Sequence, residues 1–198
     1  MKDGNPCGRI VHDYGYYPKQ SYSVNATHSC TSVRYLTTKE VVGILDSVTY
    51  FIKGDLKNGF RQFGTHPVDW RFQVYCNGPR EHYIDLACPF GKTNSPLEFC
   101  PPVALLARSS AIRYAEEFDV RGPVLGTHVD DIFGGFKSNK SFSQAAHFRE
   151  WMCAAGKRLT MSFNMKPSKT PIPAKKQIIL AREFDSSTRR IKTVDGNW

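Results

Sequence analysis

Apolar and polar residues alternate along the chain with two different periods, and the mixture predicts helices interspersed with strands. A capping-box pattern opens at Thr37 and the following apolar residues recur at helical spacing, so a helix of about three turns is expected there. The run Val48–Leu56 has the pattern of a buried strand and carries Asp55 near its end. Alternation in Trp70–Tyr75 and Glu81–Leu86, on either side of an Asn-Gly turn, predicts a β-hairpin.

Two longer helices are predicted in the second half of the chain. Ser95-Pro96 has the form of an N-cap followed by proline, and the helical pattern continues to Phe118. Pro101-Pro102 should break or kink this helix after one turn, which leaves Val103–Phe118 as the longer piece. Ser141–Gly156 is the second helix, because a serine caps it, apolar residues form one stripe and a glycine closes it.

An acidic hairpin lies between these two helices. The stretch Gly126–Gly135 has apolar residues on both sides of Asp130-Asp131 and ends in two glycines, so we expect a strand, a tight turn at the aspartates and a second strand. Taken alone, paired aspartates are more typical of an ordinary polar turn than of a chemical site. Other strands are predicted at Gly8–Val11, 159–165 and 177–184, with a turn at Asp185–Arg190.

Composition indicates a folded protein that suits an anionic partner. Of the 198 residues, 40% are hydrophobic and 13% aromatic, which is enough apolar surface for a buried core. Lysine and arginine total 27 against 18 acidic residues, for a net charge of +9. This charge fits a nucleic-acid partner or simply favours solubility, and charge alone leaves both interpretations open.

The cysteines and the terminal sequence predict an intracellular location. The six cysteines form no Cys-x-x-Cys pair and no zinc-type cluster, so we interpret them as free thiols in a reducing compartment. The polar N-terminus predicts no signal peptide, and no apolar run approaches the roughly 18 residues of a membrane span. We expect a soluble protein of the nucleus or the cytoplasm, without a membrane partner and with its oligomeric state open.

The order of the elements gives the acidic residues a common place. Strand, helix, two strands, helix and strand make the split βαβ plan with a ferredoxin-like core, in which Asp55 and Asp130 would lie side by side on antiparallel strands. With Asp131 they would offer three carboxylates, whose hard oxygens are the ligands that Mg²⁺ prefers. Two such ions, about 3.5–4 Å apart, can activate a 3′-hydroxyl and hold a leaving pyrophosphate.

Four short motifs surround these residues in order. They are Lys53–Gln62 followed by His66-Pro67; Pro89-Phe90-Gly91 with Asn94-Ser95-Pro96 and Phe99; His128-Val129-Asp130-Asp131; and Phe163-Asn164 with Lys169 and Pro171. The ordered set resembles the reverse transcriptase palm of retroelements, with the closest match to DIRS-type retrotransposons and a more distant one to retroviral enzymes. The resemblance runs from about Arg9 to Phe184, nearly the whole chain.

The resemblance implies an α+β fold: a reverse-transcriptase-like palm with an antiparallel sheet, helices on one face, and partial fingers. One domain would fill residues 1–198, with partial fingers at 1–50 and 66–90 and the palm at 51–65 and 91–198. The thumb, RNase H and integrase or recombinase regions are expected to be absent. The chain would then be a fragment of a larger polyprotein, or a decayed or domesticated copy.

The resemblance also implies a catalytic metal site. Asp55, Asp130 and Asp131 match the catalytic carboxylates and would bind two Mg²⁺ ions, for which Mn²⁺ is a possible substitute. The backbone carbonyl of Leu56 would help to hold a metal ion. Lys169 matches a lysine that helps to protonate pyrophosphate, although Lys166 is close enough to take that place.

A dNTP site is implied by four further residues. Phe60 matches the family's steric gate, in which an aromatic ring below the sugar rejects a 2′-hydroxyl and so selects dNTPs. Phe90 and Gly91 would shape the nucleotide pocket, and Arg9 matches a basic residue of the fingers that grips the triphosphate. The chain departs from the family at His128, where tyrosine is usual, at Lys92, where an apolar residue is more common, and at the two prolines.

The expected function is therefore that of an RNA-directed DNA polymerase, which adds dNTPs to a primer on an RNA or DNA template. A second reading is a catalytically inactive or domesticated nucleic-acid-binding module that keeps the fold, which the missing thumb favours. A third is an RNA-directed RNA polymerase, which Phe60 disfavours because a bulky gate excludes ribonucleotides.

Overall fold

The computed structural model describes residue 14 and residues 23–27, 33–76, 79–137 and 142–194. The chain forms two compact units. The first unit is Met1–Val33 with Phe60–Phe99, and the second unit is Arg34–Gly59 with Cys100–Trp198. The predicted strand Gly8–Val11, which includes Arg9, lies outside the described residues.

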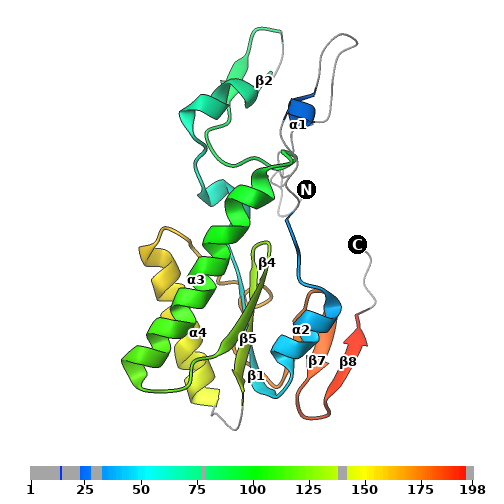
Figure 1. Cartoon of the computed structure of the whole chain (residues 1–198), viewed down its shortest axis with the longest axis vertical. Helices are drawn as coiled ribbons and strands as arrows, with labels where there is room; N and C mark the ends of the chain where they lie inside the picture. The colour runs from blue at the N-terminus through cyan, green and yellow to red at the C-terminus, as the bar shows by residue number, and fades with distance from the viewer. Residues whose placement is uncertain (1–13, 15–22, 28–32, 77–78, 138–141, 195–198) are drawn as a thin grey trace. The chain divides into compact units, whose positions relative to one another are not determined.

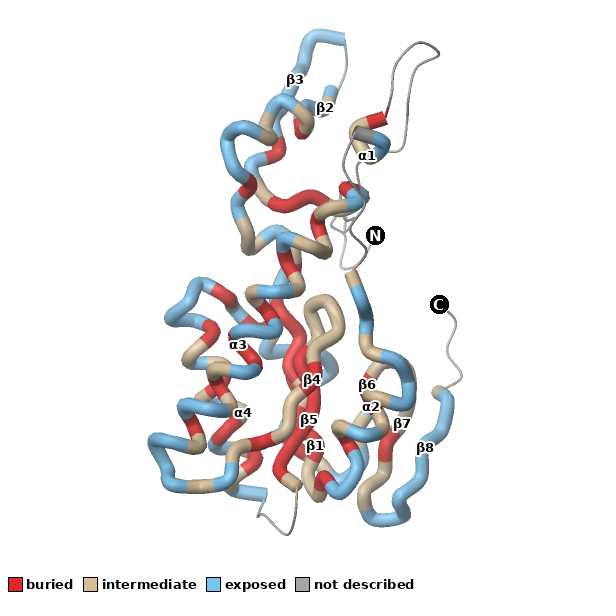
Figure 2. Tube along the Cα trace, viewed as in Figure 1, coloured by how far each residue is buried: buried red, intermediate tan, exposed pale blue. Residues whose placement is uncertain are grey.

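The main sheet of the second unit has three antiparallel strands in the order β1-β5-β4 (Figure 1). β1 is Val48–Asp55, β4 is Val124–His128 and β5 is Asp131–Lys137. Figure 2 shows buried residues along both β1 and β5. They run without a break from Ile132 to Phe136 in β5, whereas in β1 they are interrupted at Thr49, Tyr50 and Lys53. The buried strand predicted over Val48–Leu56 is confirmed, with Leu56 making a separate bridge to Phe163.

The acidic hairpin is present, but its turn lies one residue earlier than predicted. His128 pairs with Asp131 across the hairpin, so Val129 and Asp130 form the turn and Asp131 opens β5. Val129 takes a positive φ of 52°, a conformation that tight hairpin turns use and that a β-branched residue rarely adopts.

A second sheet has its strands in the order β6-β7-β8. They are β6 (Lys176–Ile179), β7 (Arg182–Asp185) and β8 (Arg190–Thr193). The single strand predicted over 177–184 is wrong, because Leu180 and Ala181 have φ values of 47° and 61°, the left-handed values of a tight two-residue turn. The turn predicted at Asp185–Arg190 joins β7 to β8 and is confirmed.

The strand predicted at residues 159–165 is also wrong. In the described part of the chain this segment contributes one bridge, from Phe163 to Leu56, and Ala174 makes another with Phe51. The edge of β1 away from β5 thus carries isolated bridges. The mixed class of helices with antiparallel sheet is confirmed, whereas the split βαβ plan stays a prediction.

Helix α2 (Thr38–Leu45) begins as predicted. Thr37 Oγ1 accepts the Glu40 N–H at 3.3 Å, and a Glu40 carboxylate oxygen accepts the Thr37 N–H at 2.8 Å, so the capping box is confirmed. The helix is shorter than predicted, because Asp46 leaves helical geometry and Val48 already belongs to β1.

Helix α3 (Ser95–Phe118) runs through Pro101-Pro102 without interruption, so the predicted break is wrong. Pro101 faces solvent, while Phe99 and Val103 on the opposite side are fully buried. Burial of this apolar stripe offsets the backbone hydrogen bonds that the prolines cannot make.

Helix α4 (Phe142–Arg158) covers the second predicted helix but does not end at Gly156. It ends where Thr160 adopts a left-handed φ of 61° and the Met161 N–H donates to the Gly156 carbonyl at 2.8 Å, a Schellman-type closure. Gly156 serves another purpose, since a Cβ there would lie 2.8 Å from the Phe163 ring. Ser141 lies outside the described residues.

Different elements cover the two faces of the main sheet. Phe133 projects from one face into a cluster with apolar residues of α2, β1, β6 and β7. Phe136 projects from the other face and contacts Tyr114 of α3 and Phe148 of α4. Figure 1 shows α2 across the sheet from α3 and α4, so the expectation of helices on one face is wrong for α2.

The first unit is built from short elements: α1 (Val24–Thr27), the 3₁₀ helix Pro67–Phe72, and a hairpin of β2 (Val74–Cys76) with β3 (His82–Ile84). The strand predicted to begin at Trp70 is wrong at its start. His66 Nδ1 accepts the Val68 N–H at 3.3 Å and opens the 3₁₀ helix, and Trp70 Nε1 donates to the Thr65 carbonyl at 3.1 Å. A further 3₁₀ turn, Gly59–Gln62, follows β1 in the chain.

The described residues bear on the expected free thiols and on the absence of a membrane span. The cysteines found there, Cys76, Cys88, Cys100 and Cys153, are free thiols as predicted. No helix in these parts of the chain is long and apolar enough to cross a membrane.

Close packing of β1 against Phe163 generates a stability prediction. A Cβ at Gly54 would lie 2.7 Å from the Phe163 ring, so Gly54→Ala should lower the free energy of unfolding by about 1–3 kcal/mol through overpacking. Gly43→Ala is the matched control, because a Cβ at this exposed position of α2 meets nothing within 4 Å and should stabilise by about 0.5–1 kcal/mol. Urea denaturation measures both, and equal effects in the same direction would contradict the packing argument.

Candidate functional site

The acidic residues meet at one end of the main sheet, inside the second unit. Asp55 ends β1 and pairs with Asp131, the first residue of β5, and Asp131 also pairs with His128 at the end of β4. Directly opposed residues of antiparallel strands project from the same face, so Asp55, Asp131 and His128 form a row across three strands. Lys53 alternates with Asp55 along β1 and projects from this face as well.

Two lysines approach the carboxylates of this row. Lys169 Nζ lies 3.2 Å from Asp55 Oδ1, and Lys53 Nζ lies 3.8 Å from Asp131 Oδ1. Asp55 is only 8% exposed, and a carboxylate so buried needs a cationic partner. Lys169 makes this contact, whereas the carbonyl of Lys166 accepts the Lys169 N–H at 2.8 Å and closes the turn that presents it.

Backbone hydrogen bonds fix the ends of the two acidic strands. The Leu56 N–H donates to the Asp130 carbonyl at 3.0 Å, and the Asn164 N–H donates to the Asp55 carbonyl at 2.8 Å. Thr170 is fully buried, and its Oγ1 accepts the Asp55 N–H at 3.2 Å. The position of Asp55 is therefore set from both of its neighbouring segments.

Asp131 occupies an unfavourable electrostatic environment. Burial raises the pKa of its carboxyl, the Lys53 ammonium acts in the opposite direction, and the Asp130 and Asp55 carboxylates add to the rise. Its Oδ1 is buried and accepts no hydrogen bond from the described residues. A buried carboxylate oxygen without a donor is the kind of group that a bound cation would satisfy.

These carboxylates have the chemistry of a Mg²⁺ site. Asp55 and Asp131 supply hard oxygens, and the Leu56 carbonyl, which accepts a long hydrogen bond of 3.3 Å from the Gly59 N–H, keeps a lone pair for a further ligand. Among the residues that the structure describes, no three His, Cys, Asp or Glu side chains are grouped closely enough to hold a metal ion together. The residue types fit the ion, and binding would require the lysine amines to give way to it.

His128 stands where the resemblance expects tyrosine. Its ring centroid lies 5.1 Å from that of Tyr35, and its Nδ1 is buried without a hydrogen-bond partner in the described structure. An aromatic ring is thus kept at this end of the row, beside Asp131.

Comparison with known proteins relates this geometry to solved structures. No protein-family model matches the chain, and no curated protein sequence matches it. The foamy viral protease-reverse transcriptase dRH in complex with double-stranded DNA superposes with a TM-score of 0.66 at 19% identity, over 90% of this chain and 27% of that one. The chain has a reverse-transcriptase-like fold.

Two further structures agree with this likeness. The native prototype foamy virus protease-reverse transcriptase gives a TM-score of 0.64 at 20% identity, over 95% of this chain and 21% of that one. The foamy viral protease-reverse transcriptase in complex with an RNA/DNA hybrid gives a TM-score of 0.65 at 19% identity, over 92% of this chain and 22% of that one. The chain spans about a quarter of the length of these structures, and at such identities the likeness concerns the fold alone.

Within the first unit of this reverse-transcriptase-like fold, the expected steric gate belongs to an aromatic cluster. The Phe60 ring lies 5.1 Å from that of Phe90 and 4.7 Å from that of Phe99, both edge-on. Phe63 contacts Phe99 at 5.2 Å. Phe60 itself is half-buried.

The turn at Gly91 depends on a backbone conformation that favours glycine and on hydrogen bonds with Asn25. Gly91 has a φ of 98°, which a residue with a Cβ rarely adopts. Asn25 brackets the turn, because its Nδ2 donates to the Gly91 carbonyl at 3.1 Å and its Oδ1 accepts the Thr93 N–H at 2.8 Å. Arg9, the remaining expected dNTP contact, lies outside the described residues.

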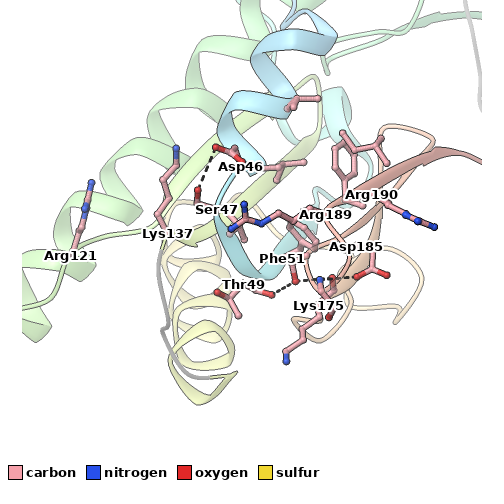
Figure 3. A pocket seen from close by; sticks show the side chains of 17 residues that line it. Asp46, Ser47, Thr49, Phe51, Arg121, Lys137, Lys175, Asp185, Arg189 and Arg190 are labelled. Atoms are coloured by element: carbon pink, nitrogen blue, oxygen red, sulfur yellow. Dashed lines mark hydrogen bonds between the residues drawn. The ribbon is translucent and has the colours of Figure 1, made fainter.

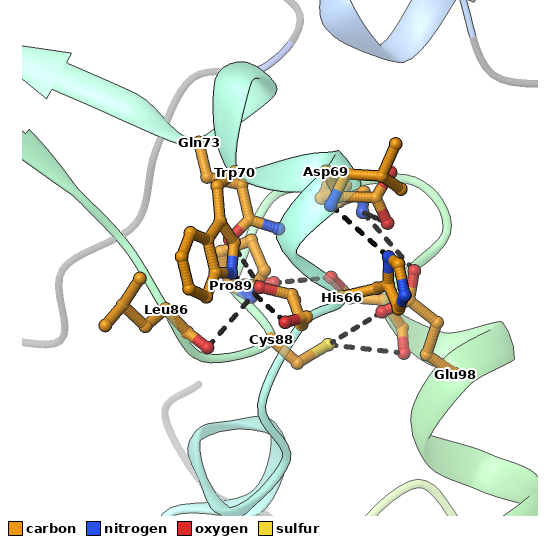
Figure 4. Close-up of polar contacts among 12 residues, drawn as sticks. His66, Asp69, Trp70, Gln73, Leu86, Cys88, Pro89 and Glu98 are labelled. Atoms are coloured by element: carbon orange, nitrogen blue, oxygen red, sulfur yellow. Dashed lines mark hydrogen bonds and ion pairs between the residues drawn. The ribbon is translucent and has the colours of Figure 1, made fainter.

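Lys92 is buried within an ion-pair group of the first unit. Its side chain is 1% exposed, with Nζ 3.3 Å from Glu98 Oε1 and 3.8 Å from Asp69 Oδ2. Figure 4 shows Cys88 and Glu98 joined in the same network, with the sulfur 3.8 Å from Glu98 Oε2. Burial raises the pKa of Cys88 to about 11, so the thiol stays protonated. Two carboxylates thus compensate a lysine where the resemblance expects an apolar residue.

Four residues that support the expected site residues were not predicted from the sequence. Thr170, Arg149, Lys53 and Asn25 position the expected site residues, and the Arg149 guanidinium donates to the Thr170 carbonyl at 2.6 Å. Only Lys53 carried a signal, because its alternation with Asp55 places both on one face. The others come from distant segments and have no local pattern.

The raised pKa of Asp131 generates a prediction about stability and pH. The folded state disfavours the ionised form of Asp131, so the pKa of this carboxyl is higher in the folded protein than in the unfolded chain. The free energy of unfolding is therefore highest below the unfolded-state pKa and falls as pH rises through the folded-state pKa. Asp131→Asn should therefore raise the free energy of unfolding at pH 7, by about 1.4 kcal/mol per unit of pKa shift. The gain should shrink as pH falls toward about 4, the ordinary carboxyl value.

Urea denaturation between pH 4 and 8 measures this difference. Asp119→Asn makes the same chemical change at an exposed position and is the matched control. A less stable Asp131→Asn protein at pH 7 would contradict the assignment of the unfavourable charge.

Proposed function

We propose that this chain carries the polymerase site of a reverse transcriptase, an RNA-directed DNA polymerase from a DIRS-type retrotransposon. The observation that carries the proposal is the pairing of Asp55 with Asp131 where β1 ends and β5 begins, with Lys169 3.2 Å from Asp55, in a reverse-transcriptase-like fold. The retrotransposon origin rests on the motif resemblance alone. The reaction adds a dNTP to a primer 3′-hydroxyl with release of pyrophosphate.

The expected site residues have distinct roles in this reaction. Asp55, Asp130 and Asp131 would hold two Mg²⁺ or Mn²⁺ ions, with the Leu56 carbonyl as a further ligand. Bound Mg²⁺ supplies charge neutralisation and favours ionisation of the 3′-hydroxyl. Lys169, whose Nζ lies 3.2 Å from Asp55 Oδ1, would protonate the leaving pyrophosphate. Phe60, Phe90, Gly91 and Arg9 would bind the dNTP.

A primer-template is the proposed partner. The foamy viral structures that this chain resembles include complexes with double-stranded DNA and with an RNA/DNA hybrid. The net charge of +9 suits a polyanion of either kind.

A second candidate function is a nucleic-acid-binding module that keeps the fold without catalysis. The specific observation in its favour is that lysines approach both Asp55 and Asp131, with no three-ligand metal group in the described part of the chain. Under this proposal the charge and the fold serve binding, and the acidic row is structural.

Primer extension separates the two candidates. On an RNA template with Mg²⁺, the wild type should extend a DNA primer with dNTPs, and Asp130→Asn should lower the rate by about a hundred-fold or more, because a charge-stabilising group of the transition state is lost. Asp119→Asn is the matched control at an exposed position and should extend normally. Absence of extension by the wild type, with retained binding of the primer-template, favours the binding module.

Sugar selection tests Phe60 separately. Phe60→Ala removes the ring beside Phe90 and Phe99, and the preference for dNTPs over NTPs should fall by about tenfold or more. Phe60→Tyr keeps the ring and should keep the preference. Single-nucleotide incorporation with matched dNTP and NTP measures the ratio, and an unchanged ratio in Phe60→Ala would remove Phe60 as the gate.

A further inference from the structure

The second unit contains a pocket of about 660 Å³ that shares no residue with the acidic row (Figure 3). It is lined by α2, the beginning of β1, and the β7–β8 turn. One side of the pocket is apolar, because Leu45, Phe51 and Phe184 line it. These three residues belong to the buried cluster around Phe133. Its volume is within the range of sites that bind small organic molecules.

Cationic side chains dominate the charged lining of this pocket. They are Arg121, Lys137, Lys175, Arg189 and Arg190, against the carboxylates Asp46 and Asp185. Within the described residues, none of these five cations makes an ion pair. Lys137 Nζ is held at the pocket by donating to the Gly43 carbonyl at 3.3 Å, with further N–H donors to spare.

The two carboxylates are engaged by neighbouring groups. Asp185 Oδ1 accepts the Ser187 N–H at 2.8 Å and the Thr188 N–H at 3.2 Å, and these backbone bonds, chiefly that of Thr188, lower the pKa of Asp185. Asp46 Oδ2 accepts from Ser47 Oγ at 3.4 Å. The cations of the pocket therefore remain available for an external anion.

Arg189 is held in an unusual conformation at this pocket. Its φ is 51°, a left-handed value that glycine or asparagine adopts more readily at the end of a hairpin turn. Figure 3 shows its guanidinium directed toward Ser47, while Arg190 points the other way. Arg189 thus occupies a turn position that favours glycine, and its side chain lines the pocket.

We propose that this pocket binds a nucleoside monophosphate. The phosphate would contact Arg189 and Lys137, because a guanidinium and an ammonium are strong donors to phosphate oxygens. The base would lie on the apolar side of the pocket, where Ile191, the exposed cross-strand partner of Phe184, offers its side chain. The nucleotide is either free in solution or the 5′-phosphorylated end of a nucleic-acid strand, since both present the same chemistry.

Amide NMR of the whole chain with adenosine 5′-monophosphate tests the proposal. The ligand should shift the amide signals of Ser186–Arg190, and adenosine without phosphate should not. Arg189→Gly should weaken binding by about tenfold, because a charged hydrogen-bond donor is lost. This variant suits the positive φ, so its melting temperature should be no lower than that of the wild type.

Controls separate the pocket from general charge and from the polymerase site. Arg108→Ala removes an exposed cation of α3 outside the pocket and should bind as the wild type does. Asp130→Asn should also bind normally, so the result does not depend on polymerase activity. Unshifted Ser186–Arg190 signals, or equal weakening by Arg189→Gly and Arg108→Ala, would overturn the proposal.

A pair of hexanucleotides identifies the source of the phosphate. If a 5′-phosphorylated strand shifts the same signals at lower concentration than adenosine 5′-monophosphate does, and the 5′-hydroxyl strand does not, the ligand is a strand end. If the free nucleotide binds more tightly than either strand, the ligand is a free nucleotide. Equal binding by the two strands would contradict recognition of a terminal phosphate.

Discussion

The opposition of two carboxylates across β1 and β5 is the constraint on which the site depends. Asp55 and Asp131 are direct partners at a partly buried end of the sheet, where like charges repel and burial raises the pKa of Asp131. Lys53 and Lys169 offset this cost from two directions. A shift of register by one residue would turn the acidic row to the opposite face, so the pairing itself must be strongly specified.

Close packing supplies that specification. β5 lies between β4 and β1, and a Cβ at Gly134 would come within 2.0 Å of the Val124 carbonyl oxygen, so this register admits only glycine there. The pairing also holds Val129 at a φ of 52°, which costs about 1–3 kcal/mol for a residue of this kind. Strain in the turn and the unfavourable charge of Asp131 are therefore concentrated at one end of the sheet. The buried residues along β1 and β5 supply the stability that keeps them there.

The two units carry different parts of the proposed chemistry. The second unit holds the acidic row and the cationic pocket, and the first holds the aromatic cluster around Phe60 and the turn at Gly91. Buried charge is compensated in both, by lysines beside aspartates in the row and by Glu98 and Asp69 beside Lys92 in the first unit. In each case an oppositely charged side chain lies near a charged group that would be costly to bury alone.

The sequence by itself determined the elements that depend on local chemistry. The capping box of α2, the buried strand β1, the acidic hairpin and helix α4 follow from hydrogen bonds and burial patterns within a few residues. Tertiary structure decided where local rules compete with packing: α3 continues through two prolines because its apolar stripe is buried, and residues 159–165 make only a bridge to β1. It also decided the support of Asp55, since Thr170 and Lys169 lie more than a hundred residues along the chain and reach it only through the fold.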